Sequence, residues 1–252
     1  MSDFDRNVAA RGGFAGRAAA VDAGLRAYML RVYNYMAAAV ALTGVVAYAT
    51  FNAAVVMDAS GKITALTPFG QTIFSGPLSI VLLLGTLGLV FFISFRINRL
   101  QFATAATLFA IYAALLGVTL APIFVTYTGA SITRVFFISA ASFGALSLYG
   151  YSTQRDLSAM GSFMIMGLFG IIIASLVNIF LKSSGLDWAI SIIGIGVFAG
   201  LTAWDTQRIK EMYDSMDDDG TMGRKAIMGA LSLYLDFINL FMMLLRLVGD
   251  RR

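Results

Sequence analysis

The stretch AIMGALSLYLDFINLFMMLL, residues 226–245, contains twenty residues, of which only Asp236 is charged. A helix of this composition matches the hydrocarbon core of a bilayer, which is about 30 Å thick and needs about 20 apolar residues. Similar runs recur along the chain, and the candidate spans lie roughly at residues 32–54, 78–95, 102–126, 135–153, 159–181, 188–208 and 226–247. The sequence therefore predicts an all-α integral membrane protein with seven transmembrane helices.

The overall composition supports this fold class. Of 252 residues, 59% are hydrophobic and 13% are charged, whereas about 25% are charged in a typical soluble domain. A soluble globular enzyme is thereby excluded, and seven spans leave no room for a separate soluble domain. We expect a basic cytoplasmic tail over residues 1–27 and a single seven-helix transmembrane domain over residues 28–252.

The chain contains no cysteine and no histidine. Disulfides, thiol chemistry and the commonest metal ligand are therefore excluded, and any proton sensing must use carboxylates. The basic residues lie beside apolar runs instead of forming a patch with interleaved aromatic residues. This pattern is typical of topology signals and argues against a nucleic-acid partner. No resident cofactor is expected.

The distribution of the basic residues favours a cytoplasmic N-terminus. This orientation places 12 of the 18 basic residues inside and 6 outside, in agreement with the positive-inside rule. Arg246, Arg251 and Arg252 then lie outside. A re-entrant last helix, which would bring these three arginines inside, remains open as an alternative.

Asp236 is an acidic residue inside a complete span. It is the eleventh residue of its apolar run, which places it about 15 Å deep, near the membrane midplane. A carboxylate at this depth costs at least about 2.5 kcal/mol, so it should face the bundle interior and have a partner. Helical spacing puts Ser232 and Asn239 on the same face. A functional role is the main interpretation, and a structural hydrogen-bonding role is the alternative.

The predicted depth of Asp205 follows from the length of the apolar run before it. The uncharged run between Asp187 and Asp205 has 17 residues, fewer than the about 20 that a crossing needs. We therefore place Asp205 at the membrane boundary, shallower than Asp236. Arg208, three residues further on, could neutralise it along the same helix face. Whether the two acids meet is left open at this point.

An acidic stretch, formed by Asp214, Asp217, Asp218 and Asp219, precedes the last span. It lacks the ligand spacing of an EF-hand and the bidentate Glu at its end. We interpret it as a solvated loop, with a cation-concentrating mouth of the pathway as the alternative.

Two segments resemble the motifs of a known family. They are AWDTQRI, residues 203–209, and SLYLDFINLF, residues 232–241, followed by Leu245 and Arg246. Both resemble the hallmark motifs of the Bax inhibitor-1 (transmembrane Bax inhibitor motif) family. The similarity covers the whole chain, through GVTLAP at residues 117–122, Asp156-Leu157 and GSF at residues 161–163. It is greatest to bacterial members, which implies a multi-pass protein of the cell (inner) membrane.

The resemblance implies a fold in which two three-helix layers surround a central C-terminal helix, and a pH-dependent calcium leak as the function. It implies that Asp205 and Asp236 form a hydrogen-bonded pair that senses pH and contacts calcium, the transported ion. A basic residue after the second span would latch Asp205, and counting back from GVTLAP identifies Arg99, with Arg96 as the alternative. Residues 78–95 lack the acid that some bacterial relatives carry there, so no third carboxylate is expected.

Three functional classes are compared. In a cation leak, Asp205 and Asp236 share a proton, and Ser232, Asn239 and Arg208 support them. Calcium prefers about six to eight oxygens, so this loose site suits passage better than storage. An intramembrane aspartyl protease is disfavoured, because Leu-Tyr-Leu precedes Asp236 where such proteases carry glycines. The third class is a non-catalytic regulator that binds membrane proteases or other membrane proteins.

Overall fold

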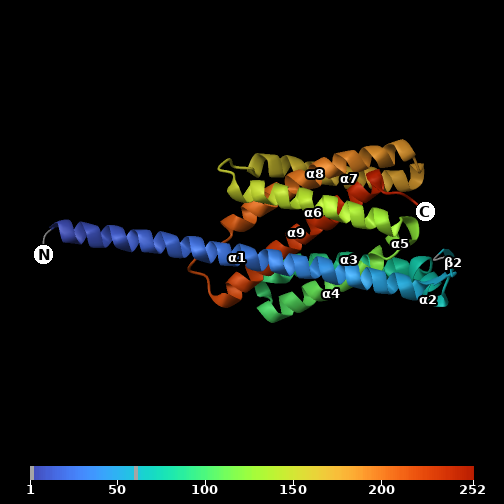
Figure 1. Ribbon diagram of the computed structural model, residues 1–252, viewed down its shortest axis with the longest axis horizontal. Coiled ribbons are helices and arrows are strands. Elements are labelled where there is room, and N and C mark those ends of the chain that lie inside the picture. The colour runs from blue at the N-terminus through green and yellow to red at the C-terminus, as the bar shows by residue number, and fades with distance from the viewer. Residues whose placement is uncertain (1–2, 60–61) are drawn as a thin grey trace.

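The computed structural model describes residues 3–59 and 62–252, and the side chains of residues 21–59 and 62–252. Within these ranges, seven helices are long and apolar enough to cross a membrane. They are α1 (Asp3–Ala54), α3 (Pro77–Arg96), α4 (Phe102–Leu120), α6 (Gly129–Ser152), α7 (Ser158–Leu181), α8 (Ser184–Glu211) and α9 (Asp219–Val248) (Figure 1). Short turns, η1 (Ile97–Arg99) and α5 (Ile123–Thr126), follow α3 and α4. The prediction of an all-α membrane protein with seven spans is confirmed.

Helix α1 is continuous from Asp3 onward. Residues 3–27 of the predicted tail are therefore helical and run directly into the first span. The span-forming part, Val21–Ala54, has 34 residues, more than the about 20 that a crossing requires. The side chains of residues 1–20 lie outside the described residues, and the cytoplasmic location of this end stays a prediction.

Besides α1, three helices begin several residues earlier than predicted. The charged residues predict that the fourth, sixth and seventh spans start at residues 135, 188 and 226. The corresponding helices, α6, α8 and α9, begin at residues 129, 184 and 219. Each start follows a polar side chain that accepts a hydrogen bond from a backbone N–H three residues on. These caps are Thr128, Ser183 and Asp218. A capped first turn at the membrane boundary tolerates charged residues, because their side chains can reach water.

The segment between the first two spans contains regular structure. Strands β1 (Val55–Met57) and β2 (Ile63–Leu66) pair in an antiparallel arrangement. Helix α2 (Pro68–Phe74) follows, and Thr67 caps it by accepting a hydrogen bond of 3.0 Å from the Gly70 N–H. The turn-rich composition predicted a loop here, but it does not reveal how short elements pair. This unit lies at the end of α1 farthest from the N-terminus (Figure 1).

Helix α9 is the most buried of the seven spans. In its most apolar window, 67% of the residues are buried, against 6% for α7 and 11% for α3. It packs against α1, α4, α6 and α8, and Figure 1 shows it running between α6, α7 and α8 on one side and α1, α3 and α4 on the other. The hydrophobic core therefore forms around the C-terminal helix. The detailed arrangement of two three-helix layers stays a prediction.

Two glycines allow the closest contacts of α8 with its neighbours. A Cβ atom on Gly150 of α6 would overlap the carbonyl oxygen of Ala203 on α8. A Cβ atom on Gly161 of α7 would overlap the ring of Trp204, the next residue of α8. In lipid, small residues of this kind let helix backbones approach and gain dispersion contacts.

The C-terminus lies at the opposite end of the bundle from the α8–α9 turn (Figure 1). Helix α9 runs without a break from Asp219 to Val248, so the alternative of a re-entrant last helix is not found. The last residues pair with the α5–α6 turn: the Thr128 N–H donates to the Asp250 carbonyl at 3.1 Å, and the Arg252 N–H donates to the Thr126 carbonyl at 2.9 Å. This pairing fixes the end of the chain to the bundle.

Reporter fusions placed after Asp58 and within residues 217–219 are expected to lie on opposite sides of the membrane, the second in the cytoplasm. The hairpin after α1 and the α8–α9 turn occupy opposite ends of the bundle (Figure 1), and the basic residues favour the turn as the inner end. Alkaline phosphatase should be active only in the first fusion, and green fluorescent protein should fluoresce only in the second. Equal activity of either reporter at both positions would contradict the seven-span topology.

Candidate functional site

The structure brings Asp205 of α8 and Asp236 of α9 together. Their carboxyl groups lie within hydrogen-bonding range of one another. Asp236 is 5% exposed, and its Oδ2 atom is buried without a donor from any other described residue. Two ionised carboxylates offer only acceptors, so this contact becomes a hydrogen bond only when a proton lies between them. The sequence left open whether the two acids meet, and the structure brings them into contact. A shared proton between them stays a prediction.

Arg208 is the basic group nearest to this pair. Its Nη1 atom lies 3.9 Å from Oδ1 of Asp205, and its side chain is 56% exposed. The guanidinium also lies 5.5 Å from the centre of the Trp204 ring. An exposed ion pair at this distance contributes little stability. Arg208 thus lies where its charge offsets part of the charge of an ionised Asp205.

Arg99 and Arg96 do not reach Asp205 in this conformation. Both side chains are exposed at the end of the second span, and neither forms an ion pair within the described part of the chain. The basic side chain paired with Asp205 is Arg208, and α3, which leads to Arg96 and Arg99, packs mainly against α4 and α2. A latch through Arg99 therefore requires a second conformation and stays a prediction.

The polar residues expected around Asp236 contribute less than predicted. The Asn239 amide donates a 2.8 Å hydrogen bond to the Leu235 carbonyl of its own helix, and Ser232 is only partly buried. Among the described residues, no group of three or more acidic side chains gathers as a metal site. Calcium takes about six to eight oxygens, so Asp205 and Asp236 could contact the ion only with water completing its shell.

A chain of hydroxyl groups links α1, α6 and α8. Tyr33 of α1 lies 2.6 Å from Ser147 of α6, and Ser147 lies 2.9 Å from Thr206 of α8. Thr206 donates its own proton to the Thr202 carbonyl at 2.8 Å, so Ser147 must donate to Thr206 and Tyr33 to Ser147. The chain thus ends one residue from Asp205. Sequence analysis missed it, because these hydroxyls come from separate helices and share no spacing.

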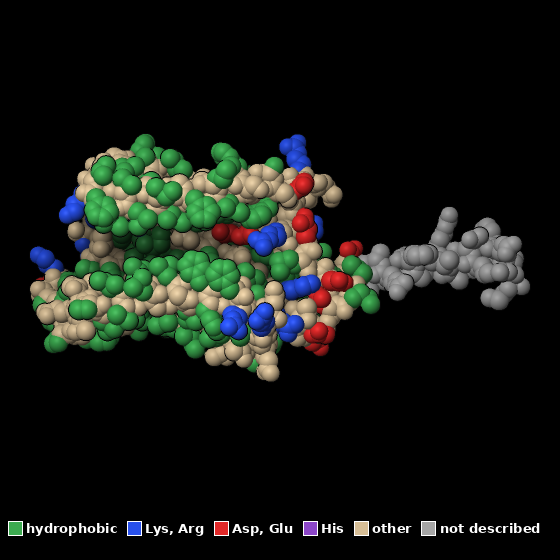
Figure 2. Space-filling model, turned by 180° about the vertical axis from the view of Figure 1, so that it is seen from behind, with side chains coloured by type: hydrophobic (Ala, Val, Ile, Leu, Met, Phe, Trp, Pro, Cys, Tyr) green, Lys and Arg blue, Asp and Glu red, His purple; other side chains and the backbone are tan. Residues whose placement is uncertain are grey.

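The face of the molecule opposite to that in Figure 1 is hollowed between two groups of helices (Figure 2). Hydrophobic side chains line both sides of this hollow. Most of the acidic side chains in view gather, together with basic ones, at the end from which the N-terminal helix projects, and further basic side chains lie at the opposite end. Such a distribution is expected where one end of a membrane bundle meets water.

A comparison with known families identifies the chain. The family model described as "Inhibitor of apoptosis-promoting Bax1" matches residues 25–252. The chain belongs to the Bax inhibitor-1 family. An uncharacterized protein of Rickettsia prowazekii is 52% identical over 92% of each chain. The inner membrane protein YbhL of Escherichia coli K12 is 46% identical over 91% of this chain and 94% of its own length. The membership predicted from the two motifs is confirmed.

The Bax inhibitor-1 motif at residues 203–209 also has a structural role. Gln207 accepts a 2.8 Å hydrogen bond from the Leu157 N–H and donates one of 2.8 Å to the Arg155 carbonyl. Trp204 fills the space beside Gly161. The motif therefore holds the α6–α7 turn against α8 and contacts the segments at residues 156–157 and 161–163.

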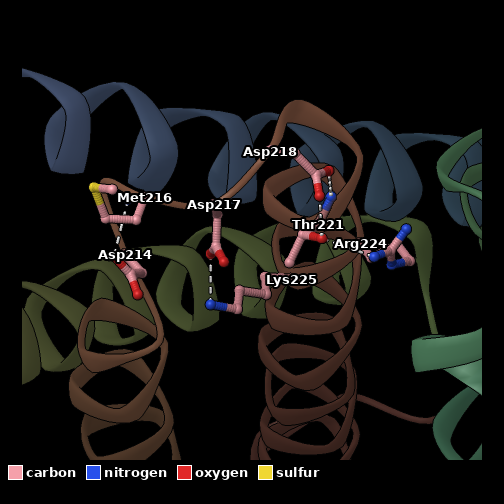
Figure 3. A network of polar contacts seen from close by, with 7 residues as sticks. All are labelled: Asp214, Met216, Asp217, Asp218, Thr221, Arg224 and Lys225. Carbon is pink, nitrogen blue, oxygen red and sulfur yellow. Dashed lines mark hydrogen bonds and ion pairs between the residues drawn. The ribbon is translucent and has the colours of Figure 1, made fainter.

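The acidic stretch of this Bax inhibitor-1 protein forms an ordered turn (Figure 3). Asp218 caps α9 by accepting a 2.7 Å hydrogen bond from the Thr221 N–H, and Asp217 pairs with Lys225. Asp214 accepts a 2.9 Å hydrogen bond from the Met216 N–H. Figure 3 shows these side chains using their carboxylates within the turn. This arrangement agrees with a solvated loop, and a role as a cation-concentrating mouth stays the alternative.

Proposed function

We propose that this Bax inhibitor-1 family protein is a non-enzymatic, pH-sensitive calcium leak of the inner membrane, controlled by the Asp205–Asp236 pair. The observation that carries the proposal is the buried contact of two carboxyl groups, which can be a hydrogen bond only when a proton is shared. Seven membrane-crossing helices and the name of the relative YbhL, an inner membrane protein, support the location.

Asp156 and Asp218 are acids outside the spans whose pKa is perturbed, and both are poor candidates for a sensor near neutral pH. Hydrogen bonds from the side chain and the backbone N–H of Ser158 lower the pKa of Asp156. Hydrogen bonds from the backbone N–H and the hydroxyl of Thr221 lower the pKa of Asp218. Both groups therefore stay ionised at neutral pH, and the chain has no histidine. The buried Asp205–Asp236 pair is therefore the group better suited to respond to a change of pH near neutrality.

The pair is expected to reduce calcium flux at both extremes of pH, for a different reason at each. When both carboxyls are neutral at low pH, they attract a cation only weakly. When Asp205 is ionised at high pH, it can pair with Arg208, or with Arg99 if the second span moves toward it. We therefore expect flux to pass through a maximum with pH. The resulting site is a two-carboxylate passage with water as the remaining ligands.

Calcium entry into proteoliposomes that enclose a fluorescent calcium indicator tests this proposal. Flux above that of protein-free liposomes is expected, with a maximum as the external pH is varied. A matched preparation of heat-unfolded protein controls for damage to the bilayer. If the native protein gives no flux at any pH, the leak function is rejected and a regulator that binds membrane proteases or other membrane proteins becomes the better description.

A further inference from the structure

A groove of about 760 Å³ opens on the side of the bundle between α1 and α6. The two helices both pack against α9 but make little contact with one another, so that Phe237 of α9 contributes to the floor. Leu30 on one rim is 52% exposed, and Leu148 on the other is 67% exposed. The groove therefore faces the hydrocarbon region. Its volume lies in the range of about 300–1,000 Å³ that is typical of small-molecule sites.

The walls of this groove are suited to an apolar occupant. They are formed mainly by aliphatic and aromatic side chains and by small residues such as Ala37 and Gly144. The two hydroxyls in the middle, those of Tyr33 and Ser147, are 2.6 Å apart and bond to one another. In the middle of the groove these two hydroxyls therefore satisfy one another, and an apolar space of this size next to lipid fills with hydrocarbon.

Positive charge lies at one end of the groove only. Arg26 lines this end, and no described carboxylate forms an ion pair with it. Tyr151 lines the same end, and Lys210 donates a 2.9 Å hydrogen bond to its carbonyl. The opposite end, at Ala41, is apolar. From Arg26 to Ala41 the groove follows about 22 Å of helix, which exceeds the about 15 Å of one leaflet.

We propose that this groove binds one anionic phospholipid of the inner leaflet, with an acyl chain between α1 and α6 and its phosphate at Arg26. The apolar walls match the chain, and the basic end matches the headgroup. The proposal does not depend on the leak function, because it rests on the groove and its charge. A basic residue near the membrane surface favours an anionic lipid by about fivefold.

Native mass spectrometry of the delipidated protein, titrated with dioleoyl phosphatidylglycerol or dioleoyl phosphatidylcholine, tests the proposal. One phosphatidylglycerol should remain bound, with about a fivefold preference over phosphatidylcholine. Gly144→Phe should abolish this binding, because a side chain there has open space and enters the groove. Gly170→Phe is the matched control, since Gly170 of α7 also has open space but lies outside the groove. Arg26→Gln should keep one lipid and remove the preference.

Ala37→Leu narrows the groove from the side of α1 and provides a second variant if Gly144→Phe does not fold. The proposal is overturned if the folded groove variants bind phosphatidylglycerol as the wild type does, or if the wild type shows no preference for it. A dimer that Gly144→Phe dissociates would identify a second copy of the chain as the occupant and would also overturn it.

Discussion

Gly150→Val is expected to prevent assembly of the bundle, whereas Gly144→Val, on the same helix, is expected to leave it intact. Any Cβ atom at Gly150 overlaps the Ala203 carbonyl oxygen, and a backbone atom cannot rotate away. Helices α6 and α8 would have to separate, which disrupts packing around the motif at residues 203–209. Overpacking of a core already costs about 1–3 kcal/mol, and more when the backbone must move. This is a large share of a total stability of about 5–15 kcal/mol.

Thermal unfolding and size-exclusion chromatography in mild detergent measure this effect. Gly150→Val should appear mainly in the aggregated fraction, and Gly144→Val should elute and unfold like the wild type, because a Cβ atom at Gly144 meets no atom within 4 Å. Both substitutions place the same β-branched residue in α6, so helix propensity cancels in the comparison. A monodisperse Gly150→Val protein that unfolds at the wild-type temperature would show that α6 and α8 do not pack as closely as the contact between Gly150 and Ala203 implies.

Asp236→Asn is expected to remove the pH dependence of calcium flux. The amide cannot gain or lose the shared proton, and its NH₂ group can donate permanently to Asp205. This donated hydrogen bond favours the ionised form of Asp205, so the contact between α8 and α9 should stay the same over the tested pH range. With the wild-type pair, raising the pH removes the proton and leaves two adjacent charges, so flux should change. Flux through Asp236→Asn should stay constant over the range in which the wild type passes through its maximum.

Asp156→Asn provides the control for this experiment. Asp156 is exposed between α6 and α7, and its pKa is already lowered by Ser158, so its replacement should leave the pH profile unchanged. Infrared difference spectroscopy gives a readout that does not depend on flux, because the carbonyl band of a protonated carboxylic acid should disappear in Asp236→Asn. A variant that retains both the band and the wild-type profile would rule out the pair as the sensor.

The seven helices could be predicted because each is a run of apolar residues of membrane length. Their starts could not be predicted as well. Charges such as Arg134 and Asp187 indicate boundaries close to them, whereas Thr128 and Ser183 cap the helices several residues earlier. Propensity and charge cannot reveal such caps when the first turn extends beyond the apolar region.

The candidate site was predicted only in part from the sequence. The depth of Asp236 follows from its position in a full span, but its contact with Asp205 depends on how α8 and α9 cross, which span lengths do not determine. Arg208, three residues from Asp205, could be identified from helix spacing. The Tyr33–Ser147 contact could not, because 114 residues separate its partners.

The central position of α9 has a consequence for how the protein is made. Of the described helices, α9 is the last to leave the ribosome, and chains grow at about 5–20 residues per second. For several seconds the six preceding helices are therefore in the bilayer without the surface around which they pack. During that interval their small and polar faces, including Thr43, which later bonds to Tyr234 of α9 at 2.6 Å, are open to lipid or to the insertion machinery. Other membrane components can therefore reach, during synthesis, helix faces that α9 covers in the finished protein.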